Sequence, residues 1–597
     1  MAILSKTDIL INGSRLNYYT NCSLFQEIGE HHMMEVHCML ETIQNFCNSN
    51  SQEIDDLLGA VITIETKSYA DIDFHGELKF KGIITGLSYR KGLNSSEGDF
   101  VIIKATSPTI LADDGPHNTS YTDMSFVDIM EENFNGYDKS KLEINTSNSK
   151  LSEPLSYTVQ YNESCFNFAK RMAARNGEWI YYNGEELVFG IDKDSDELNL
   201  VLGRDLMDFN TSLTPMPQNF NYYTNDYLTN NIHLSDSSSA STSSEGSFGV
   251  VNDKAKEIFT KPTQVWINIS DDSESKNRID SLMKLQQESL QSNQIKVSGT
   301  SDNPGVMLAS TIKISNEVYR VIRVTHAYSG TGDYENYFEA ISVNIDTYPK
   351  TNVNAFPIAY SQTAKVIENH DPEGMGRIKV QLPWQQPDGL TTPWIRYLAP
   401  SASPGQGFFF IPEIDDEVMV DFEGGNAECP YAMGGLFNSD ATPPEGSSNS
   451  NNYMKILQGK SGALFKINDE DGSITIQDKA GSSIVMDGSG DIVITAAESL
   501  MVTAGKEVST SSSEDTLITS GKKIEMTSSD KASVVSGKDV LIEGAVGVTI
   551  KDSVKIDINA PNVASKADIG LKLEGTTVDV NGKATTNVKG GLLNLNC

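Results

Sequence analysis

Three histidines near the N-terminus, His31, His32 and His37, come nearest in type and spacing to a metal site. Imidazole nitrogens bind zinc, copper and iron, but a stable protein site needs three or four ligands held in one geometry. No obvious fourth ligand accompanies these histidines in the sequence. We therefore expect the cluster to lie at a surface or an interface rather than to hold a metal ion.

Two acidic pairs, Asp113-Asp114 and Asp415-Asp416, are the candidates for two-carboxylate chemistry of the glycosidase type. Adjacent residues of a strand point to opposite faces, so neither pair is well placed to hold a sugar between its carboxylates. We interpret both pairs as solvated turn residues. The sequence also lacks the HExxH, GxSxG and Walker A motifs. We predict no catalytic residue, no metal site and no cofactor.

The net charge of −35 over 597 residues limits the possible partners. It repels phosphate backbones and anionic lipids, which argues against nucleic acid, and a symmetric trimer would carry three times this charge. The N-terminus has no basic segment followed by an apolar stretch, so we predict no Sec signal, and we predict no transmembrane helix. Scattered cysteines predict free thiols, mostly buried, in a protein made in the cytoplasm. They are Cys22, Cys38, Cys47, Cys165, Cys429 and Cys597.

The last quarter of the chain has a period of eight residues that begins at Ile484. Twelve of fourteen positions at this spacing are apolar, and so are most positions two residues later. Residues i and i+2 of a strand share a face, so each octad is predicted to be a short strand with one buried face and a turn. Gly-Lys at 505–506, 521–522 and 537–538 marks every second turn. The large apolar members are Ile484, Ile492, Leu500, Val508, Ile524, Val540, Val548, Ile556, Val580 and Val588.

One such strand cannot bury its apolar face alone, so the octads must stack into a rod with a continuous core. Two rods fit the period: a single-chain solenoid with three octads per coil, or three chains wound together as a prism. The interwound rod would advance about 4.8 Å per octad and would leave no open strand edges except at its ends. The repeat by itself does not distinguish between the two.

Residues 361–438 combine short alternating strands with Gly, Pro and Asp turns, a pattern typical of a small barrel. The strands are predicted in RIKVQL, WIRYLA, EVMVDF and YAMGGLF. The segments DPEGMGRIKVQLPW, PWIRYL, GFFFIPEIDDEVMVDFEGGN and PYAMGGLFN resemble the OB-fold segment of VgrG proteins, the spike proteins of type VI secretion systems. An OB-fold often binds oligonucleotides, but the acidic residues of this one would repel phosphate groups. We therefore interpret it as a collar. Its acidic residues are Asp415, Asp416, Glu417, Asp421 and Glu423.

The segment EPLSYTVQYNESCFNFAKRMAARNGEWIYYNGEELVFG predicts a strand, an amphipathic helix and a strand. It resembles the QYxESDFNFxxRLxEExGxxYYF signature of the VgrG hub, with Cys165 in place of the usual Asp. Further helices are predicted in FVDIMEENF after Ser125 and at about 277–292. The matching residues are Gln160, Tyr161, Glu163, Ser164, Phe166, Phe168, Arg171 and Gly177.

The resemblance implies a mostly β fold with a hub of β-barrel-like domains, an OB-fold collar and a C-terminal interwound β-helix or prism. The apolar members of the repeat would then surround the axis of a homotrimer. We expect a hub at residues 1–355 with a flexible loop at 235–247, a collar at 356–440, a linker at 441–454 and a needle at 455–597.

The resemblance also implies a function. A trimeric spike would dock on a hexameric, Hcp-like inner tube, carry effectors, and puncture the target envelope when the sheath contracts, so that it leaves the cytoplasm through the machine. The interval between collar and needle is too short for an enzyme, and the chain stops after the last octad, so we expect no catalysis.

The end of the needle is apolar, which predicts docking of a separate tip protein of the PAAR class. The alternative is that these side chains pack against each other across the axis. They are Leu592, Leu593, Leu595 and Cys597. For the whole chain, two other functions stay open: the spike of a phage tail or extracellular injection particle, and a polysaccharide-degrading tail spike.

Overall fold

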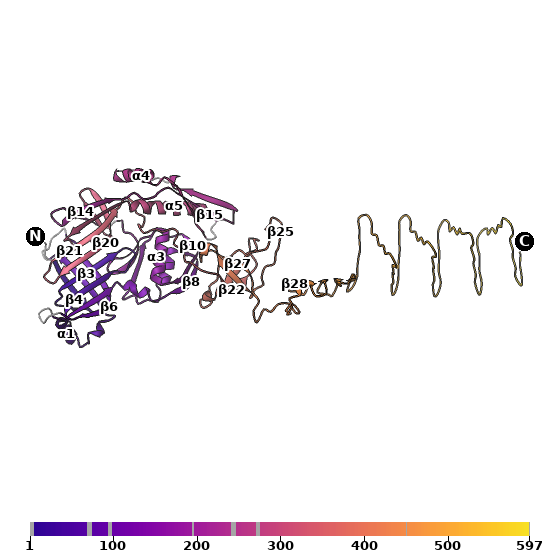
Figure 1. The fold of residues 1–597 in the computed structure, drawn as a ribbon, viewed down its shortest axis with the longest axis horizontal. Helices are drawn as coiled ribbons and strands as arrows, with labels where there is room; N and C mark the ends of the chain where they lie inside the picture. Colours follow the sequence, from indigo (N-terminus) through magenta and orange to yellow (C-terminus); the bar gives the residue numbers. More distant parts are fainter. Residues whose placement is uncertain are drawn as a thin grey trace. The chain divides into compact units, whose positions relative to one another are not determined.

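The computed structural model describes residues 5–68, 75–92, 98–193, 196–239, 246–269, 275–448 and 450–595. The chain divides into two units, Met1–Thr495 and Ala496–Cys597, which are treated separately below. Strands dominate the first unit, with few helices, which confirms the prediction of a mostly β fold (Figure 1).

A thirteen-stranded sheet forms the frame of the hub. Its two halves, which are distant in sequence, are joined by antiparallel pairing of β3 with β20, where Glu27 lies opposite Arg323. The strands in spatial order are β14 (Leu206–Leu213), β18 (Ile295–Ser301), β21 (Tyr334–Ser342), β20 (Glu317–Ser329), β3 (Asn21–Glu27), β4 (Met33–Met39), β7 (Phe100–Thr106), β6 (Leu78–Arg90), β5 (Val61–Ser68), β1 (Ser5–Ile11) and β2 (Ser14–Arg15), with β19 (Thr311–Ile314) and β13 (Glu197–Leu200) branching from β20.

Two large hydrophobic cores fill the hub. The first lies among β1 to β7 and α1 (Leu40–Ser49), where alternate residues such as Met34 and Val36 point inward, as expected for strands with one buried face. The second gathers side chains from β18 to β21 and from the helical segment at 126–189. Each core is closed by residues from both halves of the sheet.

The helices predicted in the hub are present. Helix α2 (Phe126–Asn133) begins after Ser125, whose hydroxyl accepts the N–H of Asp128 at 3.2 Å. Helix α3 (Cys165–Asn176) is capped in the same way by Ser164 and ends at Gly177, which adopts a left-handed φ of 67°. Neighbouring strands are β8 (His117–Ser125), β9 (Glu143–Asn148), β10 (Pro154–Glu163), β11 (Ile180–Tyr182) and β12 (Glu186–Gly190), and 3-10 turns lie at η1 (Asp55–Leu57) and η2 (Pro108–Ala112).

A smaller lobe consists of a three-stranded sheet and two helices. Helix α5 (Ser275–Ser292), which the sequence predicted, packs on β15 (Phe220–Asp226) and β16 (Asn231–Asp236). The predicted serine-rich loop is partly ordered, because Ser235 and Asp236 end β16 and a 3-10 turn, η3 (Ser237–Ser239), follows. Residues 240–245 of that loop lie outside the described residues. The lobe is completed by α4 (Gly246–Ile258) and β17 (Thr263–Trp266).

The collar has a four-stranded antiparallel sheet in the order β23 (Lys379–Gln381), β22 (Gln362–Glu368), β26 (Glu417–Phe422) and β27 (Pro430–Gly435). The predicted strand WIRYLA forms only isolated bridges, through Ile395 and Tyr397, because prolines at 393 and 400 bound the segment closely. A short hairpin, β24 (Ala402–Ser403) with β25 (Gln406–Gly407), extends the chain between β23 and β26, and 3-10 turns lie at η4 (Pro383–Gln385) and η5 (Glu423–Gly425).

An antiparallel meander follows the collar within the first unit. Its last two strands are the first two octads of the predicted repeat, and Ile484 lies opposite Ile494 in the pairing. The strands are β28 (Met454–Gln458), β29 (Leu464–Asn468), β30 (Ser473–Gln477), β31 (Ser483–Met486) and β32 (Ile492–Thr495).

The second unit, drawn in yellow in Figure 1, is a regular series of extended stretches and bends. As far as residue 554, bends fall at 497–498, 505–506, 513–514, 521–522, 529–530, 537–538, 545–546 and 553–554, a spacing of eight. Beyond it they fall at 561, 568–569, 576, 583–584 and 591–592, a spacing of seven or eight. All three Gly-Lys pairs lie at bends, as predicted. Among residues 496–595 the isolated chain forms no helix and no strand. The octad repeat is therefore present, and within residues 496–595 its extended stretches have no strand partner in one chain.

Candidate functional site: the junction between hub and collar, and the repeat

Strand β10 of the hub contributes to the core of the collar. Tyr157 and Val159 point from one face of β10 into a cluster that includes Val366, Val380 and Val418 of the collar sheet. On the opposite face, Gln160 points toward α3 and donates to the Glu163 carbonyl at 3.1 Å. The hub and the collar therefore share one continuous apolar core.

Buried hydrogen bonds fix the register of this shared core. Gln385, which is fully buried, donates from Nε2 to the Ser120 hydroxyl at 2.7 Å and to the Tyr157 hydroxyl at 3.3 Å. Its Oε1 accepts the N–H of Leu382, which holds η4 in place. Leaving the Gln385 amide buried without hydrogen-bond partners would cost free energy. These hydrogen bonds therefore oppose sliding of the collar along the hub.

The strongest polar contact across the junction is a buried ion cluster. Glu428, on the turn before β27, has a side chain that is 1% exposed and lies against the Arg175 guanidinium of α3. Arg171, one helical turn earlier, lies 3.8 Å from Glu428 and also pairs with Glu163 at 2.7 Å. Burial lowers the pKa of Arg175, but the Glu428 carboxylate offsets this and the pKa ends above its ordinary value.

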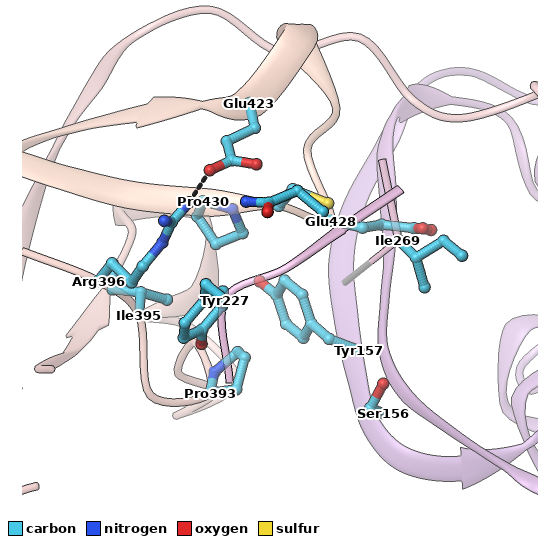
Figure 2. Close-up of a pocket in the computed structure, with 12 residues that line it drawn as sticks. Ser156, Tyr157, Tyr227, Ile269, Pro393, Ile395, Arg396, Glu423, Glu428 and Pro430 are labelled. Atoms are coloured by element: carbon cyan, nitrogen blue, oxygen red, sulfur yellow. Dashed lines mark hydrogen bonds and ion pairs between the residues drawn. The ribbon is translucent and has the colours of Figure 1, made fainter. Parts of the chain in front are cut away.

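A small cavity of about 50 Å³ lies beside this cluster (Figure 2). Its wall includes Tyr157 of the hub, Tyr227 of the lobe and Arg396 of the collar. The Arg396 guanidinium stacks 4.5 Å from the Tyr227 ring and pairs with Glu423. A space of this size holds little more than water. This cavity is therefore too small for a substrate.

The three predicted histidines differ in exposure, and His31 and His37 are half-buried. His32 is fully buried, and its Nδ1 lies 3.1 Å from Gln26 Nε2. His31 Nδ1 lies 2.7 Å from the Thr109 hydroxyl, and its ring stacks on Phe166. The surface prediction was wrong for His32, because β3 and β4 pair antiparallel and the intervening turn directs its ring into the core beside Phe80. The three histidines act as separate structural groups.

The acidic pairs are turn residues, as predicted. Asp114 accepts from the Tyr137 hydroxyl and lies 3.0 Å from His117 Nε2, and Asp416 accepts the N–H of Glu413. Four of the cysteines are buried free thiols, whereas Cys429 is half-buried. Within the described residues, His, Cys, Asp and Glu side chains form no group of three suited to a metal ion. No helix in those residues is long and apolar enough to span a membrane.

The predicted core of the needle is exposed in the isolated chain, but not evenly. From Leu500 onward, the large apolar members of the series are between 51 and 69% exposed. Between residues 500 and 560, the large apolar side chains outside the series and its i+2 positions are at least 79% exposed, namely Met501, Leu517, Val535, Leu541, Val546 and Val554. One face is thus the more sheltered between residues 500 and 560. Beyond residue 560 the contrast is lost, because Val578, outside the series, is 51% exposed and Val580 is 69% exposed. Ile484 and Ile492 lie on paired strands of the first unit.

At the predicted tip, Leu592, Leu593 and Leu595 are exposed, and Cys597 lies outside the described residues. The Glu428 cluster was not predicted, because it joins residues 253 positions apart. A usable signal was present in α3: Arg171 and Arg175 are four residues apart on a helix whose neighbouring residues are apolar, and such a pair requires a buried acidic partner.

Two family models match the chain in order. The phage tail baseplate hub (GPD) matches residues 27–330, and the type VI secretion system/phage-baseplate injector OB domain matches residues 362–437. The spike protein VgrG2a of Pseudomonas aeruginosa is 36% identical over 72 residues, 12% of this chain and 9% of that protein. VgrG1a of the same species is 29% identical over 179 residues, 28% of this chain and 27% of that protein.

The chain thus spans about a quarter or less of the length of these curated relatives. The solved structure of the lidded Francisella PdpA–VgrG complex contains a chain with the same fold at 11% identity, with a TM-score of 0.52, covering 83% of this chain and 80% of that one. The hub model alone covers about half of the residues, and the OB model follows it in sequence. This chain belongs to the phage tail baseplate hub (GPD) family.

Proposed function

We propose that this chain is the homotrimeric spike of a type VI secretion system, which caps the inner tube and punctures the target envelope when the sheath contracts. The observation that carries the proposal is the octad repeat, whose apolar face stays half exposed in one chain, whereas the hub and the collar each form a buried apolar core. Such a face requires partner chains.

Three wound chains account for the repeat better than a single-chain solenoid. In a solenoid with three octads per coil, each octad would pair with the octad one coil further along the same chain, whereas residues 496–595 form no strand in the isolated chain. Their backbone N–H and C=O groups then need partners from other chains. In the prism, Leu500, Val508, Ile524, Val540, Val548, Ile556, Val580 and Val588 surround the axis, continuing the row begun by Ile484 and Ile492. Fourteen octads at about 4.8 Å each give a needle of roughly 65 Å.

Under this proposal the function is mechanical and the chain has no catalytic role. Force enters at the hub, passes through the shared core and the Glu428 cluster into the collar, and reaches the needle. The hub would dock on a hexameric, Hcp-like tube, because the resemblance implies two barrel-like domains in each hub, and three chains would then present six. Assembly takes place in the cytoplasm, and the machine itself translocates the spike.

We propose two further partners. A PAAR-class tip protein would seat on Leu592, Leu593, Leu595 and Cys597, and effectors would travel on the spike or its tip. The exposed leucines support the first, and the solved PdpA–VgrG complex supports the second, since in it a protein with this fold has a bound partner. Nucleic acid is not among the proposed partners, because the collar is acidic around Asp415 and Asp421. Deleting residues 590–597 should abolish tip-protein binding while the trimer persists.

A second candidate is the spike of a phage tail or extracellular injection particle, since both family descriptions name phage structures. The two functions differ in how the protein leaves the cell. A secretion spike is found in the medium of intact cells and disappears when the sheath gene is deleted. A phage or particle spike is released only with cell lysis, together with assembled particles.

The primary test is the mass in solution, measured by light scattering with and without residues 455–597. The proposal expects a trimer of three times 65.2 kDa that is lost or weakened when the repeat is removed. A full-length chain that stays monomeric at micromolar concentration contradicts the interwound needle, and with it the piercing mechanism.

A further inference from the structure

The collar carries an unusually exposed aromatic segment, which we call the arm (residues 401–410). Strands β24 and β25 form a two-residue hairpin around Pro404 and Gly405, whose φ of 70° suits a type II turn. Phe408, Phe409 and Phe410 follow directly, and every residue of the arm is exposed. Figure 1 shows β25 on this projecting hairpin.

The three phenylalanines expose aromatic surface to solvent. Phe408 and Phe410 stack with centroids 4.6 Å apart, and Phe409 is 76% exposed. At about 200 Å² for each fully exposed ring, the three side chains leave on the order of 300 Å² of aromatic surface in water. This area reaches the lower end of the range for the largest apolar patch of a typical monomer, and such patches are often functional. The arm is therefore a candidate binding surface.

A groove of about 640 Å³ lies nearby on the same chain, between the lobe and the collar. We call it the aromatic groove; its wall includes Trp266 of β17 and, from the collar, Tyr397, Leu398 and Tyr431. Trp266 is 49% exposed, and Leu398 is similarly open. The Asn268 amide donates to the Glu423 carbonyl at 2.9 Å, so the lobe is fixed to the collar and the groove keeps its width.

The arm and the groove are two unpartnered surfaces of the same chemistry. Ala402, at the root of the arm, contributes to the rim of the groove, but none of the three phenylalanines enters it. In a cyclic trimer, one surface of each copy meets a different surface of the next, and three such contacts close the ring. A chain that forms this ring needs two complementary surfaces at the same height along the threefold axis. The arm and the aromatic groove adjoin each other at Ala402 and meet this requirement.

We propose that the arm of one copy inserts Phe409 into the aromatic groove of the next copy, so that three arms lock the collar. This inference rests on the proposed trimer and goes beyond it by naming the contact. The charges around the arm favour a protein occupant over an anionic membrane, because Glu413, Asp415 and Asp416 follow the phenylalanines closely. The contact also places an intersubunit clamp directly before the needle.

Photo-crosslinking of the full-length protein tests the contact. Phe409 is replaced by p-benzoyl-phenylalanine, the sample is irradiated, and crosslinked peptides are mapped by mass spectrometry while light scattering records the mass. We expect bands at two and three times 65.2 kDa and a crosslink to a peptide that contains Trp266 or Leu398. Tyr18, an exposed aromatic residue of the hub, is the control and should give no crosslink to those peptides.

The outcomes separate this inference from the proposed function. A sample that light scattering shows to be monomeric overturns the trimer and the contact together. A trimer without intermolecular bands, or with crosslinks from arm to arm, overturns the arm-in-groove contact alone. Binding of the trimer to zwitterionic lipid vesicles that is lost in Phe409→Ser would assign the arm to lipid and also overturn it.

A double-mutant cycle gives a second, independent measurement. Phe409→Ser and Trp266→Ala should each weaken trimer association by about tenfold, because each removes an aromatic anchor from one contact. If the two side chains meet, the double variant should lose little more than either single variant. Effects that multiply to about a hundredfold would show that the two residues act independently and would contradict the contact.

Discussion

The first unit buries most of its large apolar side chains within one chain, whereas the repeat leaves its apolar side chains exposed. In the hub, residues that are distant in sequence close two cores, as where β3 pairs with β20. In residues 496–595, apolar side chains recur every eight residues and remain at least half exposed. The hub and the collar therefore bury their apolar cores within one chain, whereas the repeat does not.

The two regions also differ in charge. Residues 496–597 contain eleven lysines and thirteen acidic residues, so they contribute little to the net charge of −35. Nearly all of that charge belongs to the hub and the collar. In the proposed trimer, repulsion between the three copies would therefore be concentrated in the hub and the collar, and it would be weak along the repeat.

The largest effect should come from a charge on the sheltered face of the repeat. Val540→Asp places a carboxylate in the proposed core, where three copies meet and each charge loses its water, at a cost of several kcal/mol per chain. We expect the trimer to dissociate in light scattering. Tryptophan fluorescence should hardly change, because all four tryptophans precede residue 395 and report only on the hub and collar.

The neighbouring residue supplies a matched control. Leu541 is adjacent to Val540 and is 79% exposed, against 53% for Val540. Leu541→Asp should leave the trimer intact, since adjacent residues of a strand point to opposite faces. If both variants dissociate the trimer equally, the repeat has no sheltered face and the contrast between the two regions fails.

The second effect concerns the junction within the first unit. Glu428→Ala leaves Arg175 buried without its partner, and breaking such a pair typically costs about 3–5 kcal/mol. We expect a lower urea midpoint when unfolding is followed by tryptophan fluorescence. Glu423→Ala breaks the more exposed Arg396 pair and should cost less than about 1 kcal/mol. A reversed order of the two variants would show that the cluster does not hold collar to hub.

Features set by residues close together in the sequence could be predicted, whereas contacts between residues far apart in the sequence could not. Helix α3 is visible in the sequence because Ser164 caps it, Gly177 ends it and its apolar residues recur at helical spacing. The repeat is visible because its period is short. The burial of His32 and the pairing of Glu428 with Arg175 depend on contacts between segments far apart, and no local pattern encodes a partner 253 residues away. The partner chains of the repeat are, for the same reason, a proposal.

The third effect is a pH dependence that arises in the hub, where His32 and His326 are fully buried. Burial lowers the pKa of His32 and of His326 to about 3, and Gln26 lies between the two rings. Below pH 6.5 the unfolded chain binds protons that the folded hub does not, so stability falls as the pH falls toward 3. Two such groups should cost about 4 kcal/mol between pH 6.5 and 4.5.

Urea unfolding at pH 7, 5.5 and 4.5, followed by tryptophan fluorescence, measures this slope. His326→Gln should lower the stability at pH 7, since it disturbs the bond to Tyr334, and should also halve the pH slope. His117→Gln, at an exposed position, should leave the slope unchanged. An unchanged slope in His326→Gln would mean that the buried histidines are not the origin of the acid sensitivity.

The smallest effect is expected at the turns of the repeat. A Cβ added at Gly521 meets no atom within 4 Å, so Gly521→Ala should change the stability of the trimer by less than about 1 kcal/mol per chain. At Gly190 in the hub, φ is 89° and a Cβ would lie 2.2 Å from the Asn148 carbonyl oxygen, so the same substitution there should be far more damaging. Thermal unfolding of both variants, with trimer mass and tryptophan fluorescence recorded together, measures the difference. A strongly destabilised Gly521→Ala would mean that this turn packs against a neighbouring chain, and that the outside of the needle is as closely fitted as the hub.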